Sequence, residues 1–232
     1  MGTLFVVATP IGNLEDISLR ALRVLREADL LLCEDTRVTK KLLAHYEIST
    51  PLESYHHHSN EKKKQFILSQ LQSGKTVALV TDSGTPGISD PGNELISFLL
   101  KQDSDIPIVP IPGPSALTAL ASVSGFLMQE FLFVGFPPQK KGRKTFFETI
   151  AQSSRPVVFY ESPYRIIKSL KELAEKNRGI NPSVNPRVVV GRELTKQFET
   201  IYRGSLDEVI EKLEKGERRG EFVVIFHSGE KA

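Results

Sequence analysis

The stretch LVTDSGTPGISDPG, residues 79–92, joins an apolar segment to a loop rich in glycine, proline and aspartate. Its three glycines allow close approach of the backbone to a ligand or a positive φ angle, and its two prolines restrict the loop to few conformations. A hairpin connection needs only about two to five residues, so this loop does more than reverse the chain. Its composition is that of a preorganised loop whose backbone lies against a ligand, and it also contains two carboxylates, Asp82 and Asp90.

Three other loops have a composition suited to a ligand site, namely ATPIGN at residues 8–13, CEDTR at 33–37 and IPGPSA at 111–116. Each follows a short apolar segment, as residues 79–92 do. In an open α/β sheet, ligands bind beyond the carboxyl ends of the strands, where loops lead into helix N-termini. Parallel strands would therefore bring all four loops to one edge. For any single loop, a structural crossover with turn glycines is the alternative.

Short apolar runs alternate with segments of helical period, and these are the elements that must position the loops. In the first half, we expect strands over residues 4–8, 30–33, 77–80 and 108–111, and helices over 18–28, 39–45, 61–72 and 93–101. This alternation favours an α/β fold with a mostly parallel sheet covered on both faces. The proline-rich segment 110–116 then interrupts the pattern and separates two predicted α/β domains, residues 1–111 and 112–232.

The second half predicts another α/β unit. We expect strands over residues 131–134, 157–160, 187–191, 199–202 and 221–226, and helices over 144–152, 164–175 and 206–215. The last three strands follow one another closely, which indicates partly antiparallel pairing.

Composition excludes several classes of protein. The 232 residues are 40% hydrophobic, with a net charge of +2, one cysteine, and no segment near the roughly 20 apolar residues that span a bilayer. Cys33 cannot form a disulfide within the chain, which fits a reducing compartment, and we expect a soluble cytoplasmic protein without membrane contact. The charge alone does not indicate a nucleic-acid binder, because that property depends on how cations cluster.

Four familiar motifs are absent or incomplete. SGKT at residues 73–76 lacks the first glycine of a phosphate-binding loop and lies between a predicted helix and a strand, the wrong order. No glycine fingerprint for dinucleotides and no nucleophile elbow for serine hydrolysis occurs. His56–His58 on an extended segment would point to alternating sides, and we predict no metal site there.

Six ordered segments carry a resemblance to a known family: residues 6–37, 80–92, 111–116, 133–138, 157–166 and 191–199. In them the chain resembles the RsmI type of 16S ribosomal RNA methyltransferase, a branch of the tetrapyrrole methylase superfamily. The opening block ATPIGNL, residues 8–14, differs from the Gly-Pro-Gly-Asp type of first loop in the porphyrin-methylating branches. The resemblance extends over residues 4–226.

The resemblance implies two α/β domains of the tetrapyrrole methylase type with the cofactor cleft between them. It further implies a homodimer that binds S-adenosyl-L-methionine and methylates the 2′-hydroxyl of a cytidine in the decoding region of the small ribosomal subunit. The residues that it assigns to the cofactor are Asp82, Gly84, Thr85, Pro86, Asp90, Ser115, Ala116 and Tyr160. Asp82 and Asp90 have the alternative of being turn or cap residues, and Tyr160 that of a core aromatic residue.

Methyl transfer from a positive sulfur to an oxygen neutralises charge, so alignment in a dry cleft supplies much of the rate and no metal is required. A ribose hydroxyl is a poor nucleophile, and a base or a cation near its oxygen is therefore expected. The candidates are Glu34, Asp35, Glu161, Glu193 and Lys196. We select Glu34 as the base and Lys196 as the stabilising cation, while Asp35 could instead pair with Arg37.

Recognition of RNA calls for phosphate contacts and readout of an unstacked nucleotide. The stretch PPQKKGRK, residues 137–144, is the first choice for the phosphate contacts, followed by Arg37 and Arg165. Its cations are Lys140, Lys141, Arg143 and Lys144, and a solvated helix face or loop is the alternative for such a cluster. Relatives often have a Tyr-His-x-His-Asn run, from which residues 55–60 depart. Many relatives also continue into a helical C-terminal region, so we expect either a short form or an RNA-docking tail that is supplied otherwise.

Two rival functions stay open. One is a methylase of a tetrapyrrole carbon, which would bind a porphyrin-like ligand and ignore ribosomal subunits. The other is a ribosome-binding protein without catalysis, against which the intact glycine loop argues.

Overall fold

The computed structural model describes residues 1–56, 59–90, 92–180 and 186–229. The chain divides into two compact units, Met1–Ser115 and Ala116–Ala232. The boundary predicted at residue 111 lies just before this division. Residues 112–115 group with the first unit, where the hydroxyl of Thr85 donates a hydrogen bond of 3.2 Å to the carbonyl of Pro114.

The first unit is built on a five-stranded sheet in the order β3-β2-β4-β1-β5, and every pairing in it is parallel. Its strands are β1 (Leu4–Val7), β2 (Leu30–Cys33), β3 (Leu52–Ser54), β4 (Val77–Val80) and β5 (Ile108–Ile111). Its helices are α1 (Leu19–Glu27), α2 (Thr36–His45), α3 (Glu61–Gln72) and α4 (Gly92–Gln102), with a 3-10 turn η1 at Leu14–Asp16. The predicted parallel sheet is confirmed.

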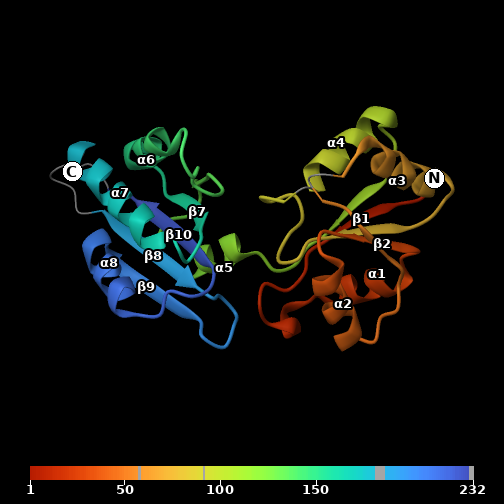
Figure 1. The fold of residues 1–232 in the computed structure, drawn as a ribbon, viewed down its shortest axis with the longest axis horizontal. Helices are drawn as coiled ribbons and strands as arrows, with labels where there is room; N and C mark the ends of the chain where they lie inside the picture. The colour runs from red at the N-terminus through yellow and green to blue at the C-terminus, as the bar shows by residue number, and fades with distance from the viewer. Residues whose placement is uncertain (57–58, 91, 181–185, 230–232) are drawn as a thin grey trace. The chain divides into compact units, whose positions relative to one another are not determined.

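Helices cover both faces of this sheet, as Figure 1 shows. Alternate residues of a strand point to opposite faces, and the strands are apolar on both. Ala78 and Val80 belong to the core beneath α1 and α2, whereas Val77 and Leu79 belong to the core beneath α3 and α4. The side chain of Ser18 caps α1 by accepting a hydrogen bond from the Ala21 amide.

The second unit contains a mixed sheet in the order β6-β7-β10-β8-β9. Its strands are β6 (Leu132–Phe133), β7 (Val157–Glu161), β8 (Arg187–Arg192), β9 (Thr200–Ser205) and β10 (Phe222–His227). Its helices are α5 (Ala116–Ser122), α6 (Arg143–Gln152), α7 (Ile166–Ile180) and α8 (Leu206–Lys215). β6 and β7 are parallel, while β10 is antiparallel to β7 and β8, and β8 to β9, which confirms the predicted antiparallel pairing of the last strands.

Three helices of this unit, α6, α7 and α8, bury their apolar sides in one core on one face of the sheet. α5 lies against the other face, where a Cβ placed on Gly191 would come within 2.9 Å of the Leu120 side chain. No helix in the described part of the chain is long and apolar enough to cross a membrane.

Candidate functional site

The four loops singled out in the sequence follow β1, β2, β4 and β5, whose parallel pairing brings their carboxyl ends to one edge. Hydrogen bonds join these loops directly. Thr9 and Gly84 exchange two backbone bonds, with the Thr9 amide 2.8 Å from the Gly84 carbonyl and the Gly84 amide 3.1 Å from that of Thr9. The Asp35 amide donates to Oδ1 of Asp82 at 3.1 Å. The convergence predicted from the sequence is therefore confirmed within the first unit.

The glycines of the loop after β4 have different roles. Gly84 has a φ of +84°, a conformation that favours glycine, and this turn allows its exchange of bonds with Thr9. Gly92 packs against Gly87, since a Cβ added to Gly92 would lie 3.1 Å from the Gly87 amide nitrogen. Gly87 and Gly92 thus allow the loop to pack against the start of α4, and Gly84 forms the turn that is hydrogen-bonded to Thr9. Pro91 lies outside the described residues.

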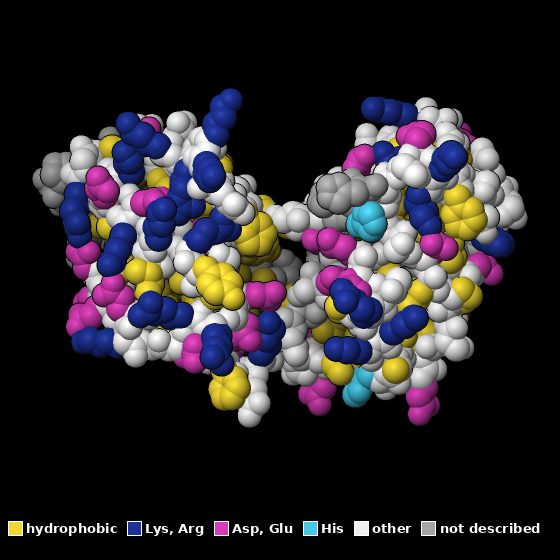
Figure 2. Space-filling view, viewed as in Figure 1, with side chains coloured by type: hydrophobic (Ala, Val, Ile, Leu, Met, Phe, Trp, Pro, Cys, Tyr) yellow, Lys and Arg dark blue, Asp and Glu magenta, His cyan; other side chains and the backbone are white. Residues whose placement is uncertain are grey.

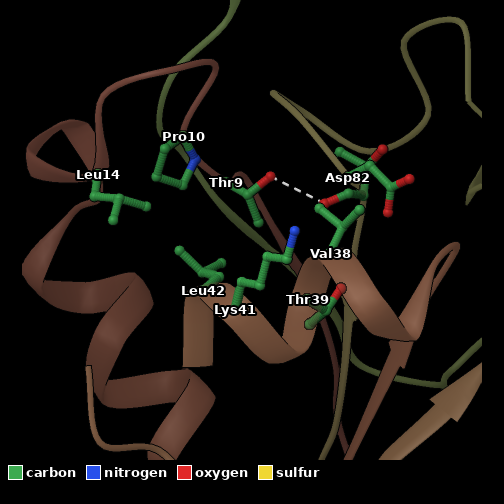
Figure 3. A pocket seen from close by; sticks show the side chains of 9 residues that line it. Thr9, Pro10, Leu14, Val38, Thr39, Lys41, Leu42 and Asp82 are labelled. Atoms are coloured by element: carbon green, nitrogen blue, oxygen red, sulfur yellow. Dashed lines mark hydrogen bonds between the residues drawn. The ribbon is translucent and has the colours of Figure 1, made fainter. Parts of the chain in front are cut away.

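A pocket of about 210 Å³ opens between this edge and α2 (Figure 3). Its lining residues are Thr9, Pro10, Leu14, Val38, Thr39, Lys41, Leu42, Thr81 and Asp82. On its floor the Thr9 hydroxyl donates to the Thr81 carbonyl at 3.0 Å. Of these residues, Asp82 was predicted to contact the cofactor, and Thr9, Pro10 and Thr81 lie in loops predicted for the site. The available signal for α2 was the spacing of Val38, Lys41 and Leu42, which places them on one side of a helix.

A second, smaller pocket lies on the other side of the end of β4. It brings together three residues that the sequence assigned to the site, Glu34, Pro86 and Asp90, with the buried ring of Tyr55 beside them. Thr81 lines both pockets. Burial, followed by the nearby charges of Glu94 and Glu61, raises the pKa of Tyr55 to about 12, so its hydroxyl stays protonated in the physiological range.

Two neighbouring carboxylates at this edge have opposite environments. Asp35 caps α2, and its Oδ2 lies 2.6 Å from Nη2 of Arg37; the hydrogen bond from the Arg37 side chain lowers the pKa of Asp35 to about 2. Burial raises the pKa of Asp82, partly opposed by the hydrogen bond from the Asp35 amide. Asp35 is therefore a structural cap and ion-pair partner, as the alternative interpretation held.

Lys196, in the second unit, is held between two carboxylates. Its ammonium lies 2.9 Å from Oε1 of Glu193 and 3.1 Å from Oε2 of Glu221. Burial lowers the pKa of Lys196, but the hydrogen bonds to Glu193 and Glu221 outweigh it, so the pKa is raised and the ammonium stays charged. Glu193 and Thr195 have positive φ angles of 51° and 66°, an uncommon conformation for residues with a side chain.

Tyr160 packs in an aromatic cluster of the second unit, with ring centroids 5.1 Å from Phe133 and 5.3 Å from Phe136. Ser115 is the last residue of the first unit and Ala116 begins α5. Ser115 directly follows Pro114, whose carbonyl accepts the hydrogen bond from Thr85 of the loop after β4, whereas Ala116 and Tyr160 belong to the second unit.

Arg143 differs from the expectation of a phosphate-binding surface residue. Its side chain is buried and donates to Glu172 at 2.7 Å, to Ser169 at 2.8 Å and to the Pro138 carbonyl at 3.1 Å. These partners occupy the guanidinium, so Arg143 anchors the loop of residues 137–144 instead of facing solvent. Lys140, Lys141 and Lys144 in the same stretch are exposed, which agrees with a phosphate-contact surface and equally with a solvated loop.

Glu161 is fully buried between two arginines of the second unit. Its carboxylate lies 3.1 Å from Nε of Arg165 and 4.0 Å from Nη1 of Arg143. This environment holds an ion pair and leaves Glu161 unsuited to be a base. Figure 2 shows cations interspersed with acidic side chains on the visible face of this unit, without one continuous basic patch.

No group of His, Cys, Asp and Glu residues suited to a metal ion occurs within the described ranges. His57 and His58 lie outside those ranges.

Comparisons with known proteins identify the fold and the family. The family model for tetrapyrrole (corrin/porphyrin) methylases matches residues 3–210. Among solved structures, a cobalt precorrin-4 methyltransferase aligns with a TM-score of 0.68 at 20% identity, covering 97% of this chain and 94% of the other. A uroporphyrin-III C-methyl transferase from Thermus thermophilus, complexed with S-adenyl homocysteine, aligns with a TM-score of 0.66 at 22% identity, covering 97% of each chain.

Two curated relatives narrow the assignment. The ribosomal RNA small subunit methyltransferase I of Thermotoga maritima is 42% identical over 99% of this chain and 100% of its own length. The protein of the same name from Halalkalibacterium halodurans is 43% identical over 99% of this chain and 78% of its own. The chain belongs to the tetrapyrrole methylase family, and within it to the group of ribosomal RNA small subunit methyltransferases I.

Proposed function

We propose that this protein transfers the methyl group of S-adenosyl-L-methionine to 16S ribosomal RNA of the small subunit, at the 2′-hydroxyl of a cytidine in the decoding region. The observation that carries the proposal is the identity of 42% over the full length of a relative named for methylation of small-subunit ribosomal RNA. The joined loops at the edge of the first sheet supply a site of suitable chemistry.

The loop after β4 fits a cofactor that carries a net positive charge. S-adenosylmethionine has a sulfonium, an ammonium and one carboxylate, and residues 81–90 contain two carboxylates and no Lys or Arg. Asp82 and Asp90 are the acceptors that we assign to the cofactor, with Gly84, Thr85 and Pro86 supplying backbone surface. Ser115, Ala116 and Tyr160 complete the proposed set. When bound, the cofactor supplies an activated methyl group.

The proton of the ribose hydroxyl needs an acceptor, and Glu34 is the proposed base. Glu34 is half-buried and lines the smaller pocket with Asp90. The other carboxylates considered, Asp35, Glu161 and Glu193, are bound to Arg37, Arg165 and Lys196, respectively, and so are poor bases. Lys196 is the proposed cation that stabilises the developing oxygen charge, since its surroundings keep it protonated.

The exposed lysines of residues 137–144 are the proposed phosphate contacts. Lys140, Lys141 and Lys144 are exposed, although Lys144 lies 3.9 Å from Glu148. Arg143 supports them by fixing the loop through Glu172 and Pro138. Arg37 and Arg165 are secondary candidates, each already paired with a carboxylate.

The proposal includes a homodimer that works in the cytoplasm, where ribosomal subunits are assembled. The second unit exposes large apolar side chains, such as Leu127 at 80% and Phe198 at 66%, of the kind that an interface between copies buries. Light scattering of the purified protein gives the oligomeric state directly.

Transfer of labelled methyl from S-adenosylmethionine to small ribosomal subunits tests the function, with subunits taken from cells that lack this protein. Nucleoside analysis should recover the label as 2′-O-methylcytidine. Cofactor binding without label on the RNA would contradict the proposed acceptor and favour a small-molecule substrate.

A further inference from the structure

The pocket between residues 9–14 and α2 has apolar walls on two sides. Pro10 and Leu14 come from the segment after β1, and Val38 and Leu42 come from α2, as Figure 3 shows. Leu14 and Val38 remain 36% and 40% exposed, respectively. Apolar walls of this kind suit a ligand that presents apolar faces to them.

The same pocket carries a small number of polar groups. Lys41 extends its ammonium from α2 toward the space beside Thr9, and Asp82 closes the other end. Among the described residues, Lys41 has no ion-pair partner, whereas its neighbour Arg37 is paired with Asp35. The buried hydroxyl of Thr39 also lines the pocket and bonds to no nitrogen or oxygen; its polar neighbour is the Cys33 thiol.

We propose that this pocket holds an unstacked nucleobase of the RNA, with Lys41 donating a hydrogen bond to an acceptor atom on the edge of the base. The inference rests on the proposed function and assigns the site at which the protein binds its acceptor nucleotide. A nucleobase has two apolar faces and a polar edge, which matches two apolar walls with polar groups between them.

Other occupants fit less well. A phosphate would meet the carboxylate of Asp82, a like charge, and the apolar side chains of Val38 and Leu42. A purely aliphatic ligand would desolvate the Lys41 ammonium without offering it an acceptor, and would add no donor to the Asp82 carboxylate beyond the Asp35 amide. A base edge offers acceptors to Lys41 and amino donors to Asp82.

The location of the pocket supports the same occupant. Asp82 lines the pocket and belongs to the loop that we assign to the cofactor, so the pocket borders the proposed methyl donor. In-line transfer needs reacting atoms about 3–3.5 Å apart, so the acceptor nucleotide has to be held next to that loop.

Two matched pairs of variants of the full-length protein test the proposal. Lys41→Gln and Lys40→Gln each remove one cation from exposed positions of α2, but only Lys41 lines the pocket. Val38→Trp fills the pocket, whereas Ala44→Trp adds the same ring at an exposed position of α2 that does not line it. Methyl transfer to small ribosomal subunits, cofactor affinity and the thermal unfolding midpoint are measured for all four.

We expect Lys41→Gln to lower kcat/KM by about tenfold or more, as for loss of a charge-assisted hydrogen bond, and Lys40→Gln by no more than about threefold. Val38→Trp should lower it by at least about tenfold, while Ala44→Trp stays near the wild type. Cofactor affinity and unfolding midpoints should match the wild type throughout.

Equal activities of the two variants within each pair would overturn the assignment of the pocket to a nucleobase, provided that the wild type transfers label. A parallel loss of cofactor affinity in Val38→Trp or Lys41→Gln would also overturn it, since the pocket would then belong to the cofactor. A wild type that labels no RNA would instead remove the proposed function, and the nucleobase assignment with it.

Discussion

At the scale of single residues, the chemistry depends on which carboxylates are already bound. Asp35 and Glu161 are bound to arginines, whereas Glu34 and Asp82 line pockets. The sequence predicted that Glu34, Asp35 and Asp82 belong to site loops, because loop composition is local. It could not show that Arg143 is buried, because that depends on Glu172 and Ser169, which lie in another helix. The residues of α2 that line the larger pocket were missed for a similar reason, since only the fold places η1 opposite Val38.

Asp82→Asn tests the cofactor site. Asparagine keeps the acceptor for the Asp35 amide but loses the negative charge, so we expect about a tenfold weaker affinity for S-adenosylmethionine and an unchanged unfolding midpoint. Burial raises the pKa of Asp82, and protonation removes its charge. The wild-type affinity should therefore fall as the pH drops through this raised pKa, and the variant should lack that dependence. Calorimetry at several pH values measures both; an unaltered affinity at neutral pH would exclude Asp82 from the site.

Glu34→Gln tests the proposed base. Removal of a general base should lower kcat by about 100-fold and leave cofactor affinity intact. Asp35→Asn is the matched control, because asparagine is an equally good helix cap and the variant loses the adjacent carboxylate. Single-turnover transfer assays compare the two. If Asp35→Asn loses as much as Glu34→Gln, Glu34 has no special role.

At the scale of elements, the long amphipathic helices and the apolar strands were predicted to within a few residues. The sequence missed β3, since Leu52–Ser54 is three residues long and gains its strand geometry from pairing with β2. It also missed α5, because the prolines just before Ala116 masked a seven-residue helix. α7 reaches Ile180, beyond the predicted end at residue 175. Short elements depend on their neighbours more than on their own residues.

The loop of residues 137–144 supports a prediction at this scale. Reversal of Lys140, Lys141 and Lys144 to Glu should weaken binding of small ribosomal subunits and flatten its dependence on salt, because about three phosphate contacts are lost. Arg143 is kept, since its reversal would place a carboxylate beside Glu161 and Glu172.

The control triple reverses Lys171, Arg178 and Lys215, exposed cations of α7 and α8. In filter-binding assays at several salt concentrations, the affinity of this control for small ribosomal subunits should depend on salt as steeply as that of the wild type. Equal slopes for the two triples would place the RNA surface elsewhere.

At the scale of the whole molecule, the chain holds two separate sets of cores. The first unit has a core on each face of its own sheet, and the second has a core under α6, α7 and α8. Each unit thus has what a domain needs to fold independently.

A fragment of residues 1–115 should therefore fold alone. We expect cooperative thermal unfolding with helical circular dichroism. A fragment of residues 1–107 is the control: it lacks β5, the partner of β1, and should be less stable. Failure of the longer fragment to unfold cooperatively would show that the first unit depends on the second.

Both edges of the first sheet are poor templates for a further strand. β5 forms one edge, and its exposed Pro110 has no amide hydrogen to donate to a newcomer. β3 forms the other edge and offers only three residues. The folded first unit is therefore protected against cross-β aggregation along this sheet, although its strands are among the most apolar segments of the chain.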